Sequence, residues 1–243
     1  MKIAVFQVEG LTLRGEIAGE EAVGMGRRWP LSQVRLLPPV LPTKIVCLGR
    51  NYAAHAQELG NEVPERPLLF FKPPSAVIGP GEPILLPPSP RVDYEGELAV
   101  VIGRRCRNVE PAEAQEVILG YTCLNDVTDR AAQKWEKNWV RAKGFDTSCP
   151  IGPWIVTPDE LSFPLTVETY VNGELRQRGD TSQLIFGIPE IIQEITSFMT
   201  LEEGDVIATG TPAGVGPLAP GDRVEVRISG IGSLVNRVER GAD

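Results

Sequence analysis

The fold class is indicated most clearly by residues 93–102, DYEGELAVVI. The apolar and β-branched content from Tyr94 to Ile102 predicts a strand. Because side chains alternate between the two faces of a strand, Glu95 and Glu97 are expected on one face, within ~7 Å of each other. Two such carboxylates repel unless a proton or a cation relieves them, and Mg²⁺, Mn²⁺ and Ca²⁺ favour carboxylate oxygens. A solvated edge strand with both glutamates facing water is the alternative that this motif alone leaves open.

Short strands of similar character recur along the chain, at residues 2–8, 11–17, 44–49, 151–156, 165–171, 206–208, 224–228 and 233–238. Helices are expected over residues 51–59, 111–118, 131–140 and 188–199, the last of which carries an apolar stripe at helical spacing. Nine prolines between Pro64 and Pro90 exclude a regular helix or a central strand in that stretch. Strands outnumber helices and rarely alternate with them, which predicts an α+β, mainly β fold and not a doubly wound α/β fold.

A proline-rich connector, LLPPVLP at residues 36–42, follows the first strands. Proline fixes φ and lacks an N–H donor, so this segment is expected to be extended and semi-rigid. We therefore predict a small N-terminal β appendage over residues 1–40 and a main domain over residues 41–243. The first hairpin of the appendage is expected to turn at Glu9-Gly10.

The composition excludes several classes of protein. With 32 acidic and 24 basic residues the net charge is −8, so nucleic-acid binding through phosphate neutralisation is not expected. No stretch approaches the ~20 apolar residues of a membrane span. The four cysteines form no CxxC pair, and we expect free thiols in a reducing cytoplasm. The chain has one histidine, His55, which excludes a two-histidine zinc site within one chain.

A third carboxylate, Asp126, is expected at the end of a strand, where functional side chains commonly emerge. Together with Glu95 and Glu97 it would form a three-carboxylate face with open positions for water and substrate. Asp126 can instead be a turn residue or the N-cap of the helix over residues 131–140, although Asp129 could fill that position.

Three further features have both a functional and a structural explanation. His55 and Glu58 share one face of a short helix, so the carboxylate can orient the imidazole as a general base, but an exposed pair is commoner. Lys143 near a metal could hold an enolate or position a water, but the helix dipole also explains a lysine there. Residues 209–216, TGTPAGVG, lack the P-loop and GxSxG patterns. Such a glycine-rich turn, with its N–H groups and a threonine hydroxyl, can bind a carboxylate or be a tight turn.

An ordered set of short motifs carries a family resemblance. The motifs are GRNY at 49–52 followed by His55 and Glu58, FKPPS at 71–75, DYEGE at 93–97, NDVTDR at 125–130, KGFD at 143–146 and GDVIATGTP at 204–212. In this combination the chain resembles the fumarylacetoacetate hydrolase family from about residue 44 to 238. Residues 1–40 are similar to the small N-terminal β appendage of some bacterial members.

The resemblance implies a mixed β-sandwich roll with a few short helices, and a homodimer. It implies that Glu95, Glu97 and Asp126 hold Mg²⁺ or Mn²⁺, with Ca²⁺ able to use the same oxygens, and that Lys143 lies beside them. It implies a lid that carries His55 and Glu58. The residues that it implies for the substrate are Arg130 and Gln133 at a carboxylate or carbonyl, with Arg50, Lys72, Ser75 and Thr211 as further pocket residues.

The family's substrates are 2-oxo or 2-hydroxy-enol acids, whose carboxylate and adjacent oxygen chelate one metal ion that stabilises an enolate. We expect an isomerase, also able to decarboxylate, for 2-hydroxy-diene or 2-oxo dicarboxylates of aromatic-acid catabolism, with 2-hydroxyhepta-2,4-diene-1,7-dioate as candidate substrate. The alternatives are an acylpyruvate C–C hydrolase or an oxaloacetate decarboxylase that uses His55 and Glu58. A non-catalytic oligomeric binding module is the alternative of another class.

Overall fold

The computed structural model describes residues 1–58, 60 and 62–241. Its α-helices are α1 Ala53–Glu58, α2 Arg130–Trp135, α3 Val140–Gly144 and α4 Ile188–Phe198. Its 3₁₀ helices span Leu31–Gln33, Pro74–Ala76, Pro111–Val117, Pro158–Glu160 and Thr181–Gln183. The strands are β1 Lys2–Val8, β2 Leu11–Ala18, β3 Glu21–Gly24, β4 Arg27–Pro30, β5 Arg35–Leu37, β6 Ile45–Gly49, β7 Leu68–Lys72, β8 Val77–Ile78, β9 Ile84–Leu86, β10 Val92–Tyr94, β11 Gly96–Ile102, β12 Ile118–Asn125, β13 Thr128–Asp129, β14 Cys149–Val156, β15 Thr166–Val171, β16 Glu174–Asp180, β17 Val206–Ala208, β18 Gly216–Pro217, β19 Arg223–Ile228 and β20 Gly232–Arg240. The mainly β prediction is confirmed.

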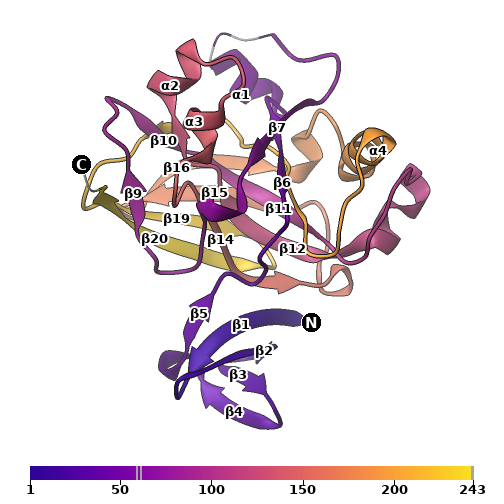
Figure 1. The fold of residues 1–243 in the computed structure, drawn as a ribbon, viewed down its shortest axis with the longest axis vertical. Coiled ribbons are helices and arrows are strands. Elements are labelled where there is room, and N and C mark those ends of the chain that lie inside the picture. The colour runs from indigo at the N-terminus through magenta and orange to yellow at the C-terminus, as the bar shows by residue number, and fades with distance from the viewer. Residues whose placement is uncertain (59, 61, 242–243) are drawn as a thin grey trace.

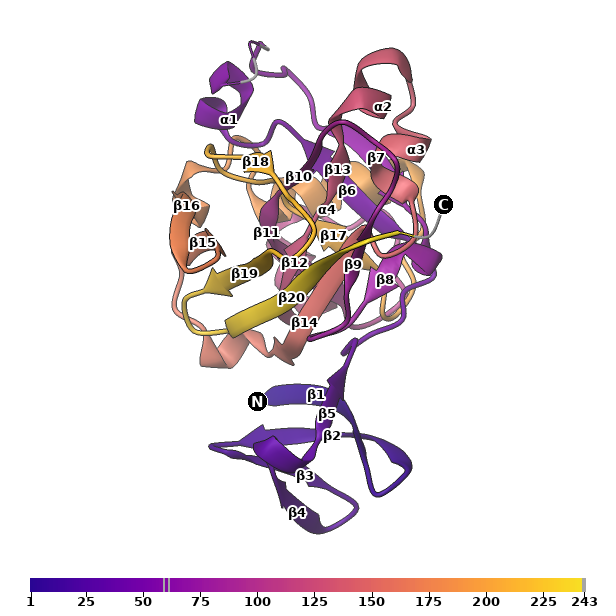
Figure 2. The same ribbon diagram turned by 90° about the vertical axis from the view of Figure 1, so that its left-hand side faces the viewer.

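The strands form three sheets. The largest has 12 strands and runs β4-β3-β2-β1-β14-β12-β11-β17-β6-β7, with β5 on β1 and β8 on β14. A second sheet runs β16-β15-β19-β20-β9, and a small third sheet runs β13-β10-β18. The proline-rich stretch was predicted to contain no central strand, and its strand β7 lies at the end of the strand order of the largest sheet. Figures 1 and 2 show β1–β5 at one end of the molecule and α1, α2 and α3 at the other.

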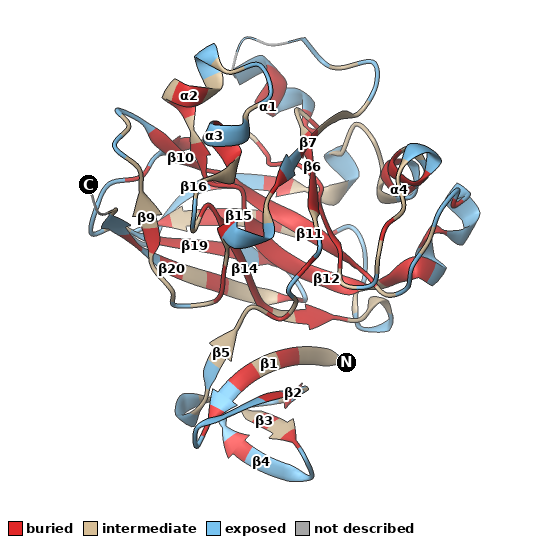
Figure 3. Ribbon diagram, viewed as in Figure 1, coloured by how far each residue is buried: buried red, intermediate tan, exposed pale blue. Residues whose placement is uncertain are grey.

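The main core lies between the largest sheet and the β15-β19-β20 sheet. It contains Leu98 and Val100 from β11 and Val226 from β19, all at most 1% exposed. Figure 3 shows that β11 is buried along its whole length. Helix α4 adds Ile191, Ile192 and Ile195, each worth roughly 1.5–3 kcal/mol when fully buried. The predicted apolar stripe of this helix is therefore confirmed, although Phe198 at its end is exposed.

Strands β1–β5 have an apolar cluster of their own around Phe6 and Trp29, whose rings meet edge to face. The predicted hairpin over residues 2–8 and 11–17 is present, while β3 and β4 were not predicted. The first residues of the proline-rich connector belong to β5, which pairs with β1. Because β1 also pairs with β14 of the main body, the domain boundary after residue 40 stays a prediction.

Several predicted elements need correction. The strand expected from Tyr94 to Ile102 is broken at Glu95 into β10 and β11. The helix expected over 111–118 is a 3₁₀ helix, and the one expected over 131–140 is two helices, α2 and α3. The break follows from Trp139, which has a left-handed backbone (φ 56°), and from Glu136, whose carboxylate accepts the Arg141 N–H of α3.

The helix expected over residues 51–59 is shorter at its start, since α1 begins at Ala53. Its predicted end at Leu59 lies outside the described residues. Strand β16 was not predicted, because exposed polar residues dominate it. Within the described ranges of the chain, no helix is long and apolar enough to cross a membrane.

Candidate metal and active site

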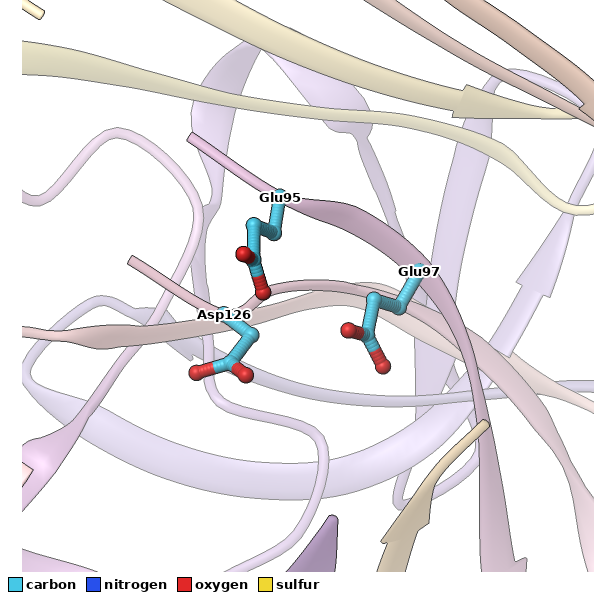
Figure 4. Close-up of side chains that lie close together, drawn as sticks. All are labelled: Glu95, Glu97 and Asp126. Carbon is cyan, nitrogen blue, oxygen red and sulfur yellow. The ribbon is translucent and has the colours of Figure 1, made fainter. Parts of the chain in front are cut away.

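Three carboxylates converge where β11 and β12 lie side by side. The antiparallel register places Gly96 opposite Asn125, so Glu95 and Glu97 flank the position that Asp126 reaches from the end of β12. The Asp126 N–H donates to the Glu95 carbonyl at 2.8 Å, which fixes the two residues against each other. One oxygen from each of the three carboxylates lies within 4.8 Å of the others. Figure 4 shows the three side chains pointing toward a common space.

Two of the carboxylates are paired with buried cations. Lys143 Nζ lies 2.7 Å from Glu95 Oε2 and 2.6 Å from Asp126 Oδ2. Lys72 Nζ lies 2.7 Å from Asp126 Oδ1, and Arg130 Nη2 lies 2.6 Å from Glu95 Oε1. Burial alone would raise the pKa of Glu95, but Lys143 and Arg130 outweigh it and hold that pKa well below its usual range. Burial opposes the charge of Lys143 as well, yet Asp126 and Glu95 raise its pKa.

Glu97 is different from the other two. Among the described residues no basic side chain forms an ion pair with it, and its Oε2 accepts only the Gly210 N–H, at 2.7 Å. Burial, together with Asp126 and Glu95, raises the pKa of Glu97 well above its usual range. A carboxylate in this situation needs either a proton or an added cation. The all-oxygen donor set fits a hard divalent ion such as Mg²⁺ or Mn²⁺.

The alternative role of Asp126 as a helix cap is not what the structure shows. Asp129 caps α2, since its side chain accepts the N–H groups of Ala131 and Ala132 at 2.9 and 3.1 Å. Asp126 is fully buried and faces the lysines instead. The capping position is thus filled by the neighbour that the sequence offered, which leaves Asp126 free for the carboxylate cluster.

His55 and Glu58 lie on α1 as predicted. His55 is 5% exposed, and its Nδ1 is 3.6 Å from Glu58 Oε2, which is ion-pair range but longer than a hydrogen bond. Burial, more than any other cause, lowers the pKa of His55, and Arg130 and Lys143 act in the same direction against Glu95 and Glu58. The imidazole is therefore neutral at pH 7 and able to accept a proton. The Gly214 N–H donates to both oxygens of Glu58 at 3.1 Å.

A cavity of about 370 Å³ joins these groups. It brings together most of the predicted site residues, namely Arg50, His55, Glu95, Glu97, Arg130, Gln133, Lys143 and Thr211. Glu58 and Asp126 are not among the cavity residues, but they contact His55 and Lys143, which are. Lys72 lies behind Asp126, fully buried, where it also donates to the Lys143 carbonyl oxygen. Ser75 is exposed on the 3₁₀ helix Pro74–Ala76 and is not among the cavity residues.

Sequence reasoning missed other parts of the site. Asp93 is completely buried, and it accepts Arg91 through both of its oxygens (2.8 and 2.9 Å) and Arg130 through one (2.8 Å). This pairing orients Arg130, whose Nη1 also meets Gln133 Oε1 at 2.9 Å. Asp93 lies in the motif DYEGE, so the sequence could have identified it as a candidate site residue. Its partner Arg130, 37 positions away, could not be read from the motif. Arg91, Lys134 and Trp139 also line the cavity.

The chain matches the family model of the fumarylacetoacetate (FAA) hydrolase C-terminal domain over residues 44–239. Because this match covers most of the 243 residues, the chain belongs to that family.

Relatives with assigned and unassigned activities resemble most or all of the chain. An uncharacterized protein of Archaeoglobus fulgidus is 54% identical across 91% of this chain and 88% of its own, and an oxaloacetate tautomerase of Bacillus subtilis is 44% identical across 86% and 75%. The structure of 2-hydroxyhepta-2,4-diene-1,7-dioate isomerase from Mycobacterium marinum is 42% identical with a TM-score of 0.91, and each chain is covered completely. Maleylpyruvate hydrolase from Sphingobium sp. SYK-6, solved with a manganese(II) ion and pyruvate, is 34% identical with a TM-score of 0.87, again over both whole chains. The chain is accordingly an enzyme of a family that includes isomerases, tautomerases and hydrolases.

Proposed function

We propose that the protein is a metal-dependent isomerase, also able to decarboxylate, that acts on 2-hydroxy-diene or 2-oxo dicarboxylates. The observation that carries the proposal is Glu97, a buried carboxylate without a cationic partner among the described residues, beside Glu95 and Asp126. The likeness to an isomerase and to an oxaloacetate tautomerase supports the reaction class. The first substrate to test is 2-hydroxyhepta-2,4-diene-1,7-dioate, with oxaloacetate next.

Glu95, Glu97 and Asp126 would hold Mg²⁺ or Mn²⁺, which supplies stabilisation of negative charge on a substrate oxygen. Arg130 and Gln133 line the same cavity and are suited to hold a carboxylate or carbonyl of the substrate. Asp93 keeps the Arg130 guanidinium in place. The Lys143 ammonium lies between Glu95 and Asp126, where it can stabilise charge that develops next to the carboxylates.

The proposal is tested with purified protein and a panel of 2-oxo and 2-hydroxy-enol acids, with Mg²⁺ or Mn²⁺ added. Double-bond shift is followed by the ultraviolet spectrum, and CO₂ and pyruvate are measured in the same reactions. We expect the dienol spectrum to change faster than without enzyme, and the change to stop when a chelator is added. A spectrum that changes only at the uncatalysed rate would exclude this substrate. Calorimetric titration with Mn²⁺ that gives no heat above buffer would exclude the three-carboxylate site.

A second candidate is an acylpyruvate C–C hydrolase or an oxaloacetate decarboxylase. It is favoured by the buried, neutral His55 beside Glu58 on the wall of the same cavity, which is what a general base for water requires. The likeness to maleylpyruvate hydrolase is in line with it. Pyruvate release that disappears in His55→Asn, while isomerisation stays at the wild-type rate, would support hydrolysis. Equal pyruvate release by both proteins would remove His55 from the reaction.

We also propose that the enzyme is a homodimer, on the basis of the family resemblance. Sedimentation equilibrium is the direct test, because a dimer has twice the 26.5 kDa of one chain. A non-catalytic binding role would require that Glu97→Ala leave every turnover and the metal affinity unchanged.

A further inference from the structure

One buried amide, Gln177, lies next to the carboxylate cluster without touching the cavity. It is on β16, where most other side chains are exposed, yet Gln177 is only 1% exposed. Its cross-strand partner on β15 is Thr169, which also faces Gly96 of β11. A buried amide is costly unless it is hydrogen-bonded, so its partners indicate what it is for.

Gln177 hydrogen-bonds to Gly96, which lies between Glu95 and Glu97, and to the loop that follows β17. Its Oε1 accepts the Gly96 N–H at 3.0 Å, and its Nε2 donates at 2.7 Å to both Thr211 Oγ1 and the Pro212 carbonyl. The Thr211 hydroxyl in turn donates to the Gly96 carbonyl at 2.8 Å. Gln177 and Thr211 thus bind both polar groups of Gly96.

The Gln177 and Thr211 side chains supply the hydrogen bonds that a neighbouring strand would otherwise make with Gly96. On one edge β11 pairs with β12, and on the other edge β17 pairs with it at Ala99–Val101 but, in the described part of the chain, not at Gly96. The Gly96 groups on that edge would otherwise be buried without partners. The backbone orientation at Gly96 sets the directions of the Glu95 and Glu97 side chains, since these two residues are its neighbours in the chain.

The same loop holds further parts of the site. The Gly210 N–H binds Glu97 and the Gly214 N–H binds Glu58, while Gln177 fixes the loop between them through Thr211 and Pro212. The glycine-rich turn was expected either to bind a carboxylate or to be a tight turn, and the carboxylates that it binds here are those of the protein itself.

We infer that Gln177 is a positioning residue for the metal site: through Gly96 and Thr211 it sets the spacing of Glu95 and Glu97. The inference rests on the proposed metal-dependent function. Removing Gln177 leaves all three carboxylates in the chain but loosens the peptide that aims two of them. Substituting a residue that supports a metal ligand commonly weakens metal binding by roughly 10–100-fold. Gln177 acts through the backbone at Gly96, so we expect the lower end of that range.

The test is the dissociation constant of Mn²⁺, measured by calorimetry on the full chain. Gln177→Met keeps the length of the side chain and removes all its hydrogen bonds, and it should raise the Kd roughly tenfold. The matched control is Asn236→Leu, because Asn236 is also a buried amide (2% exposed) whose Nδ2 donates to two carbonyls, those of Gly79 and Glu82, outside the site. The control should lose thermal stability and keep the wild-type Kd.

A double-mutant cycle with Thr211→Val separates positioning from general damage. If Gln177 acts through Thr211, the double variant loses no more Mn²⁺ affinity than the weaker-binding single variant. If Gln177→Met does not fold, Thr211→Val and Thr211→Ser make the same test, since serine keeps the hydroxyl and should keep the affinity. Equal Kd values for Val and Ser, or a wild-type Kd in Gln177→Met, would overturn the inference alone. A wild-type protein that binds no Mn²⁺ would overturn the proposed function together with it.

Discussion

The two halves of the candidate site are built differently. Glu97 lies on β11, while Glu95 directly precedes β11 and Asp126 directly follows β12, and each is held by backbone or buried cation contacts. His55 and Glu58 lie on α1, a helix of six residues, which is too short to be stable alone. Contacts that hold it include the Gly214 N–H, which donates to Glu58, and Asn51 just before the helix, whose Nδ2 donates to the Phe186 and Thr209 carbonyls.

This difference teaches where rigidity is needed. Carboxylates that would bind one small ion must keep fixed distances, and here they lie on or directly beside paired strands, where moving them would disturb strand pairing. A short helix is easier to move than a paired strand, which suits the general-base role proposed for His55. We therefore expect the two halves to respond separately to substitution.

The largest effect is expected from Glu97→Gln. The change removes the carboxylate that has no cationic partner among the described residues. Mn²⁺ should therefore bind more than about 100-fold more weakly, a larger loss than substituting a residue that only supports a ligand usually causes. Calorimetric titration measures this, with Glu116→Gln as the control because that side chain is 68% exposed. Mn²⁺ binding at the wild-type Kd would show that Glu97 is not a ligand.

The metal-free Glu97→Gln protein should be more stable than the wild type at neutral pH. The folded state holds the Glu97 proton more tightly than the unfolded state, so wild-type stability falls as pH rises above the usual value of 4.5. Glutamine removes this loss, and the gain should disappear below that pH. Scanning calorimetry without metal checks the sign. A less stable variant at pH 7 would contradict it.

A smaller, pH-dependent effect is expected for the helix half. Because the pKa of His55 lies below its usual 6.5, the neutral base persists below that pH. Pyruvate release from acylpyruvates should therefore fall only at a pH below 6.5, by about tenfold per pH unit for one group. Rate measurements from pH 4.5 upward on His55→Asn serve as the comparison. An acid limb centred above the usual value would show that another group controls the reaction.

The smallest effect is expected from Asp129→Ala. Loss of the α2 cap should cost about 1 kcal/mol of unfolding free energy, while the Mn²⁺ affinity stays unchanged because Asp129 lies outside the cluster. Urea denaturation and Mn²⁺ titration check the two parts, and Asp129→Asn should restore stability since it keeps an acceptor. A weakened Mn²⁺ affinity would mean that α2 and the carboxylates are not independent.

Local patterns predicted much of the fold, and the reasons for the failures are physical. The α4 stripe and the β1–β2 hairpin depend on neighbours in sequence, so spacing and turn residues identified them. At the break, the Glu95 N–H donates to the Asn125 side chain, 30 positions away, and the Gly96 N–H donates to the Gln177 side chain, 81 positions away. The break before α3 depends on the left-handed backbone of Trp139, which a bulky residue gives no reason to expect.

The candidate site shows the same division. Strand alternation and the position of Asp126 at a strand end predicted that Glu95, Glu97 and Asp126 lie together, and the structure places their oxygens near one another. The choice between Asp126 and Asp129 as the helix cap needed three dimensions, because both precede the helix.

The contact between Gly214 and Glu58 has a consequence for which sequences this enzyme can tolerate. The donor is a main-chain N–H that every residue except proline possesses, so no side-chain chemistry is selected at position 214. The selection is for shape: the backbone has φ +104°, and a Cβ atom there would lie 2.1 Å from the Arg176 carbonyl oxygen. A position that contributes no side chain to the contact is thus restricted to glycine by its backbone.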